Sequence, residues 1–134
     1  MLRVALRYFE RKKSEFMLKM SDTSIRGFLP FFANAGLQVA FLVPTPTGYQ
    51  KSIMDATLPL REMLRETGIH NYMEQRQGPE HKELVKTYFL TPDRMIETEA
   101  SLYRPITKQG DPRIWFYNLK QYCVPCNLLA ILAN

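Results

Sequence analysis

The stretch Ser101-Leu-Tyr-Arg-Pro-Ile-Thr-Lys-Gln-Gly-Asp-Pro-Arg-Ile-Trp-Phe116 has the pattern of two short strands joined by a polar turn. Residues 100–103 and 114–117 have strand composition, and Gln-Gly-Asp-Pro lies between them. Cationic and planar side chains alternate around this turn. Such a mixture suits a nucleic-acid contact arm, in which cations bind phosphates and forked donors bind base edges. An ordinary surface hairpin has the same composition, so the segment alone leaves both interpretations open.

Strand patterns recur along the rest of the chain. Residues 2–9 alternate apolar and cationic side chains, which is typical of a half-buried strand. Residues 37–43 form a continuous apolar run between Gly36 and Pro44, which predicts a buried strand. Further strands are expected at residues 15–20, 84–90 and 128–132, and turns at residues 10–14 and 91–93.

One segment predicts a helix, and the next predicts a loop. From Lys51 to Thr67 the apolar residues recur near helical spacing, with Gly68 as the C-terminal stop and Pro59 at a break or a first turn. Residues 70–82 contain almost no core material and many hydrogen-bonding side chains. We expect a long polar loop there, and loops of that length are more often functional than accidental.

These elements together predict a single domain over residues 1–134. Six or seven short strands, one helix and loops rich in Pro and Gly indicate an α+β fold that is mostly β. Short turns between successive strands favour an antiparallel sheet or a small open barrel over a parallel, doubly wound sheet. Because the last strand ends almost at the last residue, we expect the domain to be part of a longer protein.

Composition and charge narrow the class of protein. Hydrophobic residues make up 46% and charged residues 23%, which argues against a disordered chain. The 18 Lys and Arg exceed the 13 Asp and Glu, and the net charge of +5 suits a polyanion binder. No apolar run approaches the roughly 20 residues that cross a bilayer, and the N-terminus lacks a secretory signal. The expectation is a cytoplasmic protein without a membrane partner.

Signatures of catalysis are weak. Asp93, Glu97 and Glu99 form an acidic cluster, but the lysine that a metal-dependent nuclease places beside its carboxylates is missing. His70 and His81 are possible general bases, yet no nucleophile elbow accompanies them. The segment Gly48-Tyr-Gln-Lys-Ser52 lacks the spacing of a nucleotide-hydrolysing phosphate loop. The sequence therefore predicts no catalytic centre and no cofactor, and leaves a small nuclease as the alternative.

The two cysteines, Cys123 and Cys126, lie in Cys-Val-Pro-Cys near the end of the chain. Two thiols do not complete a zinc site, which takes four ligands, and both histidines lie far upstream. The redox motif of this spacing precedes a long helix near the start of its fold, whereas few residues follow here. We expect reduced, structural cysteines, with metal binding and redox chemistry as alternatives.

Two polar segments carry side chains that read base pairs. Arg donates two parallel hydrogen bonds to guanine, Gln pairs with adenine, and Asp accepts from the cytosine amine. The candidate DNA-binding residues are Gln75, Arg76, Gln77, His81 and Lys82 in the loop, and Arg104, Lys108, Gln109, Asp111, Arg113 and Trp115 in the hairpin. Trp115 either stacks on bases or belongs to the core, because it and Phe116 are expected on opposite faces of one strand.

The order of strand, polar loop, strand, and then strand, basic arm and strand resembles the DNA-binding effector domains of EcoRII-type restriction endonucleases. The matching stretches are residues 75–90 and 100–115, followed by 127–133. Residues 46–56 and 111–116 are also similar to N-terminal regions of MvaI-like restriction enzymes. The resemblance implies a pseudobarrel like that of plant transcription factors, with two arms in the major groove. It also implies that any nuclease chemistry belongs to a separate catalytic domain.

The sequence thus favours a sequence-specific double-stranded DNA-binding module of a restriction endonuclease. A small metal-dependent nuclease built on Asp93, Glu97 and Glu99 is one alternative. The other is a protein-interaction module whose exposed aromatic side chains bind a partner.

Overall fold

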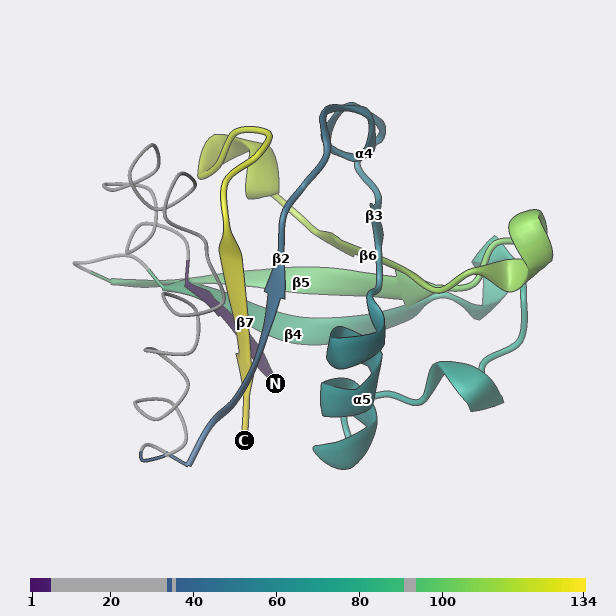
Figure 1. Ribbon diagram of the computed structural model, residues 1–134, viewed down its shortest axis with the longest axis horizontal. Coiled ribbons are helices and arrows are strands. Elements are labelled where there is room, and N and C mark those ends of the chain that lie inside the picture. The colour runs from purple at the N-terminus through teal and green to yellow at the C-terminus, as the bar shows by residue number, and fades with distance from the viewer. Residues whose placement is uncertain (6–33, 35, 91–93) are drawn as a thin grey trace.

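The main element of the computed structural model, which describes residues 1–5, 34, 36–90 and 94–134, is a curled sheet of seven strands (Figure 1). In chain order these are β1 (Leu2–Ala5), β2 (Gln38–Leu42), β3 (Met54–Asp55), β4 (Glu83–Leu90), β5 (Met95–Tyr103), β6 (Arg113–Phe116) and β7 (Leu129–Ala133). Their order across the sheet is β2-β7-β1-β4-β5-β6-β3. The predicted α+β, mostly β open barrel is confirmed.

Most neighbouring strands are antiparallel, as the short turns predict, but β1 and β4 are parallel. Their pairing is non-local, because Leu2 lies opposite Thr87. A parallel pair needs a long crossover between its strands, which short-range turn signals do not reveal. The predicted strand at residues 15–20 and the turns at residues 10–14 and 91–93 lie outside the described residues.

One face of the sheet forms the core. Alternate residues of a strand point to opposite faces, so Leu102 and Ile114, which lie opposite each other on β5 and β6, share the inner face. The largest fully buried side chains are Phe89, Phe116, Leu2, Leu60, Leu64, Leu102, Ile114, Leu119, Leu129 and Ile131. β7 is buried along its whole length and β6 at three successive residues, so both strands are covered on both faces.

The helical region differs from the single helix predicted over residues 51–67. A short helix α4 (Pro46–Lys51) begins at Thr45, whose hydroxyl accepts from the Gly48 amide at 3.0 Å, and ends at the left-handed Ser52. The chain then pairs as β3 with β6 before helix α5 (Leu58–Glu66). Pro59 lies in the first turn of α5, where a missing amide hydrogen costs nothing. The apolar residues of β3 imitate helical spacing, which explains the error.

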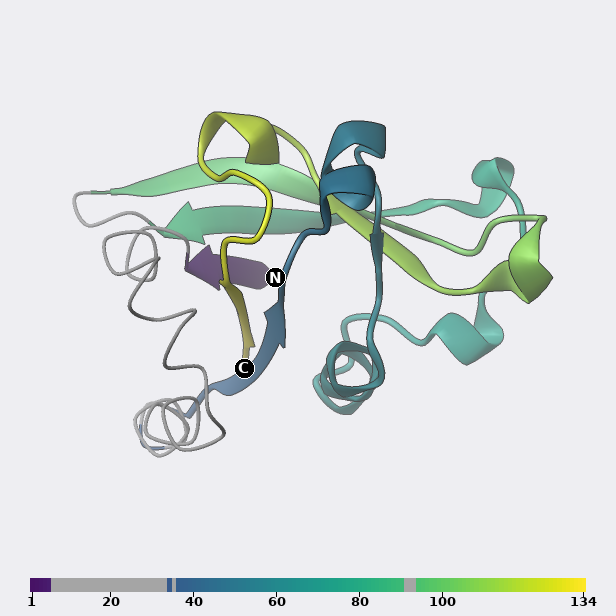
Figure 2. The ribbon, with the colours of Figure 1, turned by 45° about the horizontal axis from the view of Figure 1, so that its top comes forward.

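The connection between β2 and β3 brings the two edges of the sheet together. These strands are the outermost in the sheet order, yet only residues 43–53 separate them in the chain. A side-chain Cβ on Gly48 would lie 2.6 Å from the Ile53 carbonyl oxygen, so α4 returns closely to β3. α5 contacts β2 and β7 and lies on the open side of the curled sheet (Figure 2). Its buried Leu60, Met63 and Leu64 thereby complete the core.

The segment of residues 70–82 is irregular, as predicted, with two short 3-10 turns at Tyr72–Glu74 and Pro79–His81. The expectation that it lacks core material is wrong, because His70, Tyr72 and Gln75 are buried. Polar side chains reach the interior here since each finds a hydrogen-bond partner. In the part of the chain that the structure describes, no helix is long and apolar enough to cross a membrane.

Candidate nucleic-acid interface

The loop of residues 70–82 and the β5–β6 connection of residues 104–112 lie side by side at one end of the sheet (Figure 1). Gln77 and Arg104 form an isolated β-bridge, and the Gly78 amide donates to the Arg104 carbonyl at 2.7 Å. We call these two segments together the rim. The rim unites the two regions in which the sequence places its candidate DNA-binding residues.

Gln75, Arg104 and Tyr72 lie at the inner side of the rim, which we call the base of the rim. Gln75 bonds the segments that meet there. Its side-chain Nε2 donates to the carbonyls of His81 at 2.9 Å and Leu102 at 2.8 Å. Its Oε1 therefore accepts from the His70 ring nitrogen Nε2, 3.0 Å away. The other ring nitrogen of His70 lies 2.7 Å from the Glu83 carboxylate. Because Gln75 is buried and its amide is engaged, it positions the loop and is not presented to a ligand.

Arg104 is the second residue at the base. Its Nε donates to the Gly110 carbonyl at 2.9 Å, and one terminal nitrogen lies 3.2 Å from the Gln75 carbonyl and 3.4 Å from the Tyr72 carbonyl. A guanidinium with this many backbone partners fixes the loop against the hairpin. Arg104 therefore positions the rim, although the sequence indicates that it contacts DNA phosphates or nucleobases.

Tyr72 is buried beneath the same base. Its hydroxyl donates to the Arg113 carbonyl at 2.9 Å, and its ring packs edge-on against the His70 ring, with the centroids 4.4 Å apart. Burial raises the pKa of the Tyr72 phenol, an effect that the nearby Arg61 opposes and Glu83 reinforces. The phenol thus remains protonated and able to donate.

The tip of the rim, Lys108-Gln109, has a strained backbone. Lys108 has φ +51° and Gln109 φ +58°, and Gly110 continues the left-handed run at φ +72°. A left-handed conformation costs a residue with a Cβ about 1 to 2 kcal/mol. Both side chains are exposed, and neither makes a hydrogen bond or ion pair within the described residues. Strain of this kind gathers where a surface is used in binding.

The other predicted site residues occupy different environments. Arg76, Gln77, Lys82 and Asp111 are exposed, whereas His81 and Arg113 are partly buried. Gln77 reaches the tip, because its Nε2 donates to the Gln109 carbonyl at 3.3 Å. The Lys82 ammonium lies 5.5 Å from the centre of the Tyr103 ring, a cation–π contact. His81 lies 3.7 Å from the Glu80 carboxylate.

Trp115 is only 8% exposed, and its neighbours Ile114 and Phe116 are fully buried. The expectation that Trp115 and Phe116 divide between the core and the solvent is wrong, because β6 is covered on both faces. Burial on this scale leaves no ring face for stacking on a base. The indole contributes to packing beneath the hairpin.

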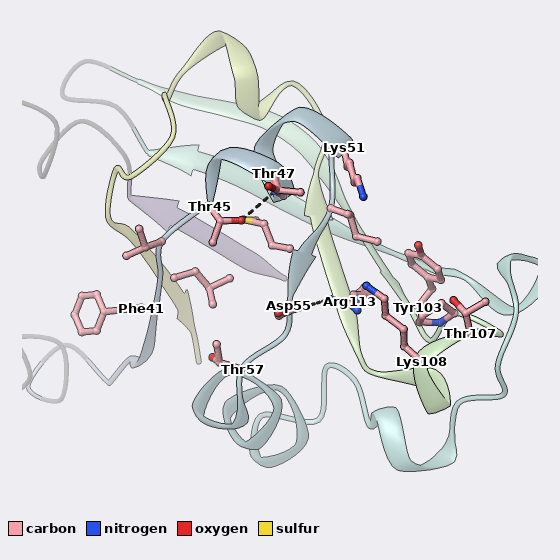
Figure 3. Close-up of a pocket in the computed structure, with 16 residues that line it drawn as sticks. Phe41, Thr45, Thr47, Lys51, Asp55, Thr57, Tyr103, Thr107, Lys108 and Arg113 are labelled. Atoms are coloured by element: carbon pink, nitrogen blue, oxygen red, sulfur yellow. Dashed lines mark hydrogen bonds and ion pairs between the residues drawn. The ribbon is translucent and has the colours of Figure 1, made fainter.

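A cavity of about 500 Å³ lies beside the rim, where β2, α4 and β3 face the hairpin (Figure 3). Tyr103 on β5, Arg113 on β6 and Asp55 on β3 lie opposite one another across the three strands. Their neighbours Leu102, Ile114 and Met54 belong to the core, so this row faces outward. Arg113 forms an ion pair with Asp55 (Figure 3). We call this space the seam cavity.

Lys51 and Tyr103 line the seam cavity but are absent from the predicted site. Lys51 lies far from the hairpin in sequence, so no local pattern relates the two. The sequence contained one signal, the Gly48 to Ser52 segment with its lysine, but its spacing argues only against nucleotide hydrolysis.

Two members of the predicted acidic cluster lie within the described residues. Glu97 and Glu99 are exposed on β5, and Glu97 pairs with Lys86 at 3.3 Å, while Asp93 lies outside the described residues. Hydrogen bonds to Tyr88 and then to Glu97 raise the pKa of Lys86. Among the residues that the structure describes, no group of three or more His, Cys, Asp or Glu side chains is arranged to hold a metal ion.

Both cysteines lie within the described residues, Cys123 buried and Cys126 exposed, and no disulfide joins the two. Cys126 is also left-handed, with φ +72°. Its amide donates to the Pro44 carbonyl at 2.9 Å, which ties this loop to the end of β2.

Comparison with known proteins adds no identification: no family model matches the chain, and no curated protein or solved structure matches it either. The rim and the seam cavity therefore carry the functional argument by themselves.

Proposed function

We propose that this protein binds double-stranded DNA sequence-specifically through the rim, as the recognition module of a cytoplasmic restriction endonuclease. The observation that carries the proposal is the tip. Lys108 and Gln109 combine a cation and a bidentate amide on a strained, exposed turn, and no described residue bonds their side chains. A cation of this kind binds a phosphate, and a glutamine amide reads an adenine edge.

The base of the rim supports the proposal by making the tip rigid. Gln75 and Arg104 bond the loop and the hairpin to each other, so the tip is presented without the entropy loss of ordering two free loops. Arg76 and Lys82 extend the cationic surface along the loop. The resemblance to EcoRII-type effector domains points the same way and assigns cleavage to a domain outside this chain.

The direct test is fluorescence anisotropy with duplexes selected from a random pool, repeated at rising salt. We expect Lys108→Ala to weaken binding to all duplexes and to reduce the slope of log K against log salt by about one, as for the loss of one phosphate contact. Gln109→Ala is expected to cost about 1 to 3 kcal/mol on the selected duplex only, with relaxed specificity.

Lys86→Ala is the matched control. It removes the same charge from an exposed lysine that pairs with Glu97 on the strand surface, away from the tip. Equal losses for Lys86→Ala and Lys108→Ala would mean that net charge, and not the tip, sets affinity. Absence of binding to any duplex at low salt would refute the proposal.

A further inference from the structure

The seam cavity has a cationic end and an apolar end. Lys51, Lys108 and Arg113 line it together with the hydroxyl side chains of Tyr103 and Thr107. In Figure 3 the labelled hairpin residues lie together on the right with Lys51 above them, whereas Phe41 lies on the left with its ring directed away from them. The apolar part of the lining consists of Leu42, Val43, Ile53 and Met54.

The charges at the cationic end are not balanced within the described residues. Asp55 is the one carboxylate among the described residues that line the cavity, and it pairs with Arg113. The ammonium groups of Lys51 and Lys108 have no ion pair with any residue that the structure describes. Two like charges on one cavity favour a bound anion, because an anion between them relieves their repulsion.

The size and polarity of the cavity indicate the kind of anion. A volume of about 500 Å³ is within the range of small-molecule sites and exceeds what a lone phosphate fills. Hydroxyl and ammonium donors suit phosphate oxygens. The apolar wall at the other end suits a planar ring, since rings gain most of their binding free energy from buried apolar surface.

We propose that the seam cavity binds a nucleotide, with the phosphate between Lys51 and Lys108 and the base against the apolar part of the lining. The site shares Lys108 with the rim tip but extends beyond it, because Lys51 and Tyr103 lie outside the tip. The segment around Lys51 lacks the phosphate-loop spacing, and the proposal is one of binding alone.

Isothermal titration of the full chain with nucleoside monophosphates, and with inorganic phosphate alone, tests the proposal. Saturable nucleotide binding is expected, with phosphate at least about tenfold weaker because it leaves the apolar end unfilled. Lys51→Ala should weaken nucleotide binding about tenfold, as for the loss of one charged hydrogen bond. Lys86→Ala, with the same charge change on the β4 surface, should leave it unchanged.

The outcomes separate this site from DNA binding by the rim. Gln109→Ala is expected to alter duplex recognition and leave nucleotide affinity unchanged, whereas Lys51→Ala does the reverse. If a single-stranded oligonucleotide competes with the nucleotide, the natural ligand is a nucleotide within a DNA chain. If it does not compete, the natural ligand is a free nucleotide. Either result supports a nucleotide site in the seam cavity. Three results would overturn the proposed nucleotide site. These are no saturable binding at millimolar nucleotide, equal affinity for nucleotide and phosphate, and equal losses of affinity in Lys51→Ala and Lys86→Ala.

Discussion

Gln75 and Gln109 belong to the same rim and carry the same side chain, yet their surroundings are opposite. At the base, Gln75 is 7% exposed, and its amide bonds two carbonyls and a histidine ring. At the tip, Gln109 is exposed on a left-handed backbone, without a side-chain bond to any described residue. The hydrogen bonds of the base stabilise the fold, and this stability offsets the strain of the tip. A rigid scaffold holds a strained contact surface in this way.

Gln75→Leu tests the difference between Gln75 and Gln109 most directly, because it keeps the side-chain volume and removes the amide. We expect a loss of about 3 kcal/mol in the free energy of unfolding, because buried partners of Gln75 lose their hydrogen bonds. Urea unfolding measures the loss. Gln109→Leu is the matched control and should cost less than about 0.5 kcal/mol. Similar losses in the two variants would contradict the distinction between base and tip.

Arg104→Ala tests the other residue of the base. Removal of its bonds to the Gly110, Gln75 and Tyr72 carbonyls should cost about 2 kcal/mol, because hydrogen bonds from a charged donor are worth more than neutral ones. Faster hydrogen exchange at the Gly78 amide, which donates to the Arg104 carbonyl, is expected alongside. Arg76→Ala, an exposed arginine of the same loop, serves as the control. An unchanged exchange rate in Arg104→Ala would show that the loop does not depend on this side chain.

Alkaline pH loosens the base through Tyr72. The raised pKa of this phenol means that, above about pH 10, the unfolded chain loses a proton that the folded chain keeps. Stability should therefore fall as pH rises beyond that point, by about 1.4 kcal/mol per pH unit from this group. Urea unfolding between pH 9 and pH 11 checks the slope, which should be shallower in Tyr72→Phe. Identical slopes in the two proteins would exclude Tyr72 as the cause.

Relief of strain at the tip has the smallest expected effect. Gln109→Gly removes the Cβ from a residue at φ +58° and thereby relieves the strain. Glycine also gains entropy in the unfolded chain, which opposes this effect, so the net stabilisation should be at most about 1 kcal/mol. Gln109→Ala keeps the strain, so the difference between the two variants isolates the backbone contribution. Thermal unfolding measures both. A glycine variant no more stable than the alanine variant would mean that the strain at Gln109 does not exceed the entropy that glycine gains in the unfolded chain.

Local patterns were enough for four of the strands and for the position of the hairpin. Period-two and continuous apolar runs located β2, β4, β6 and β7, because side-chain burial follows the pleat of a strand. The helical region was mispredicted where the periods conflict: Met54 fits a helical face but pairs with Ile114 on β6. Two residues of strand are too few for a period to be recognised.

The sequence by itself determined an α+β domain, mostly β, with a basic balance of charge and a polar hairpin between β5 and β6. Only the tertiary structure decided which of the polar side chains are available to bind a ligand. The Gln75 amide is engaged by the Leu102 carbonyl, which is 27 residues away in the chain. Lys51 faces the hairpin because the β2–β3 connection joins the two edges of the sheet. Residue type sets the bonds that a side chain can form, but long-range packing sets whether the protein itself satisfies them.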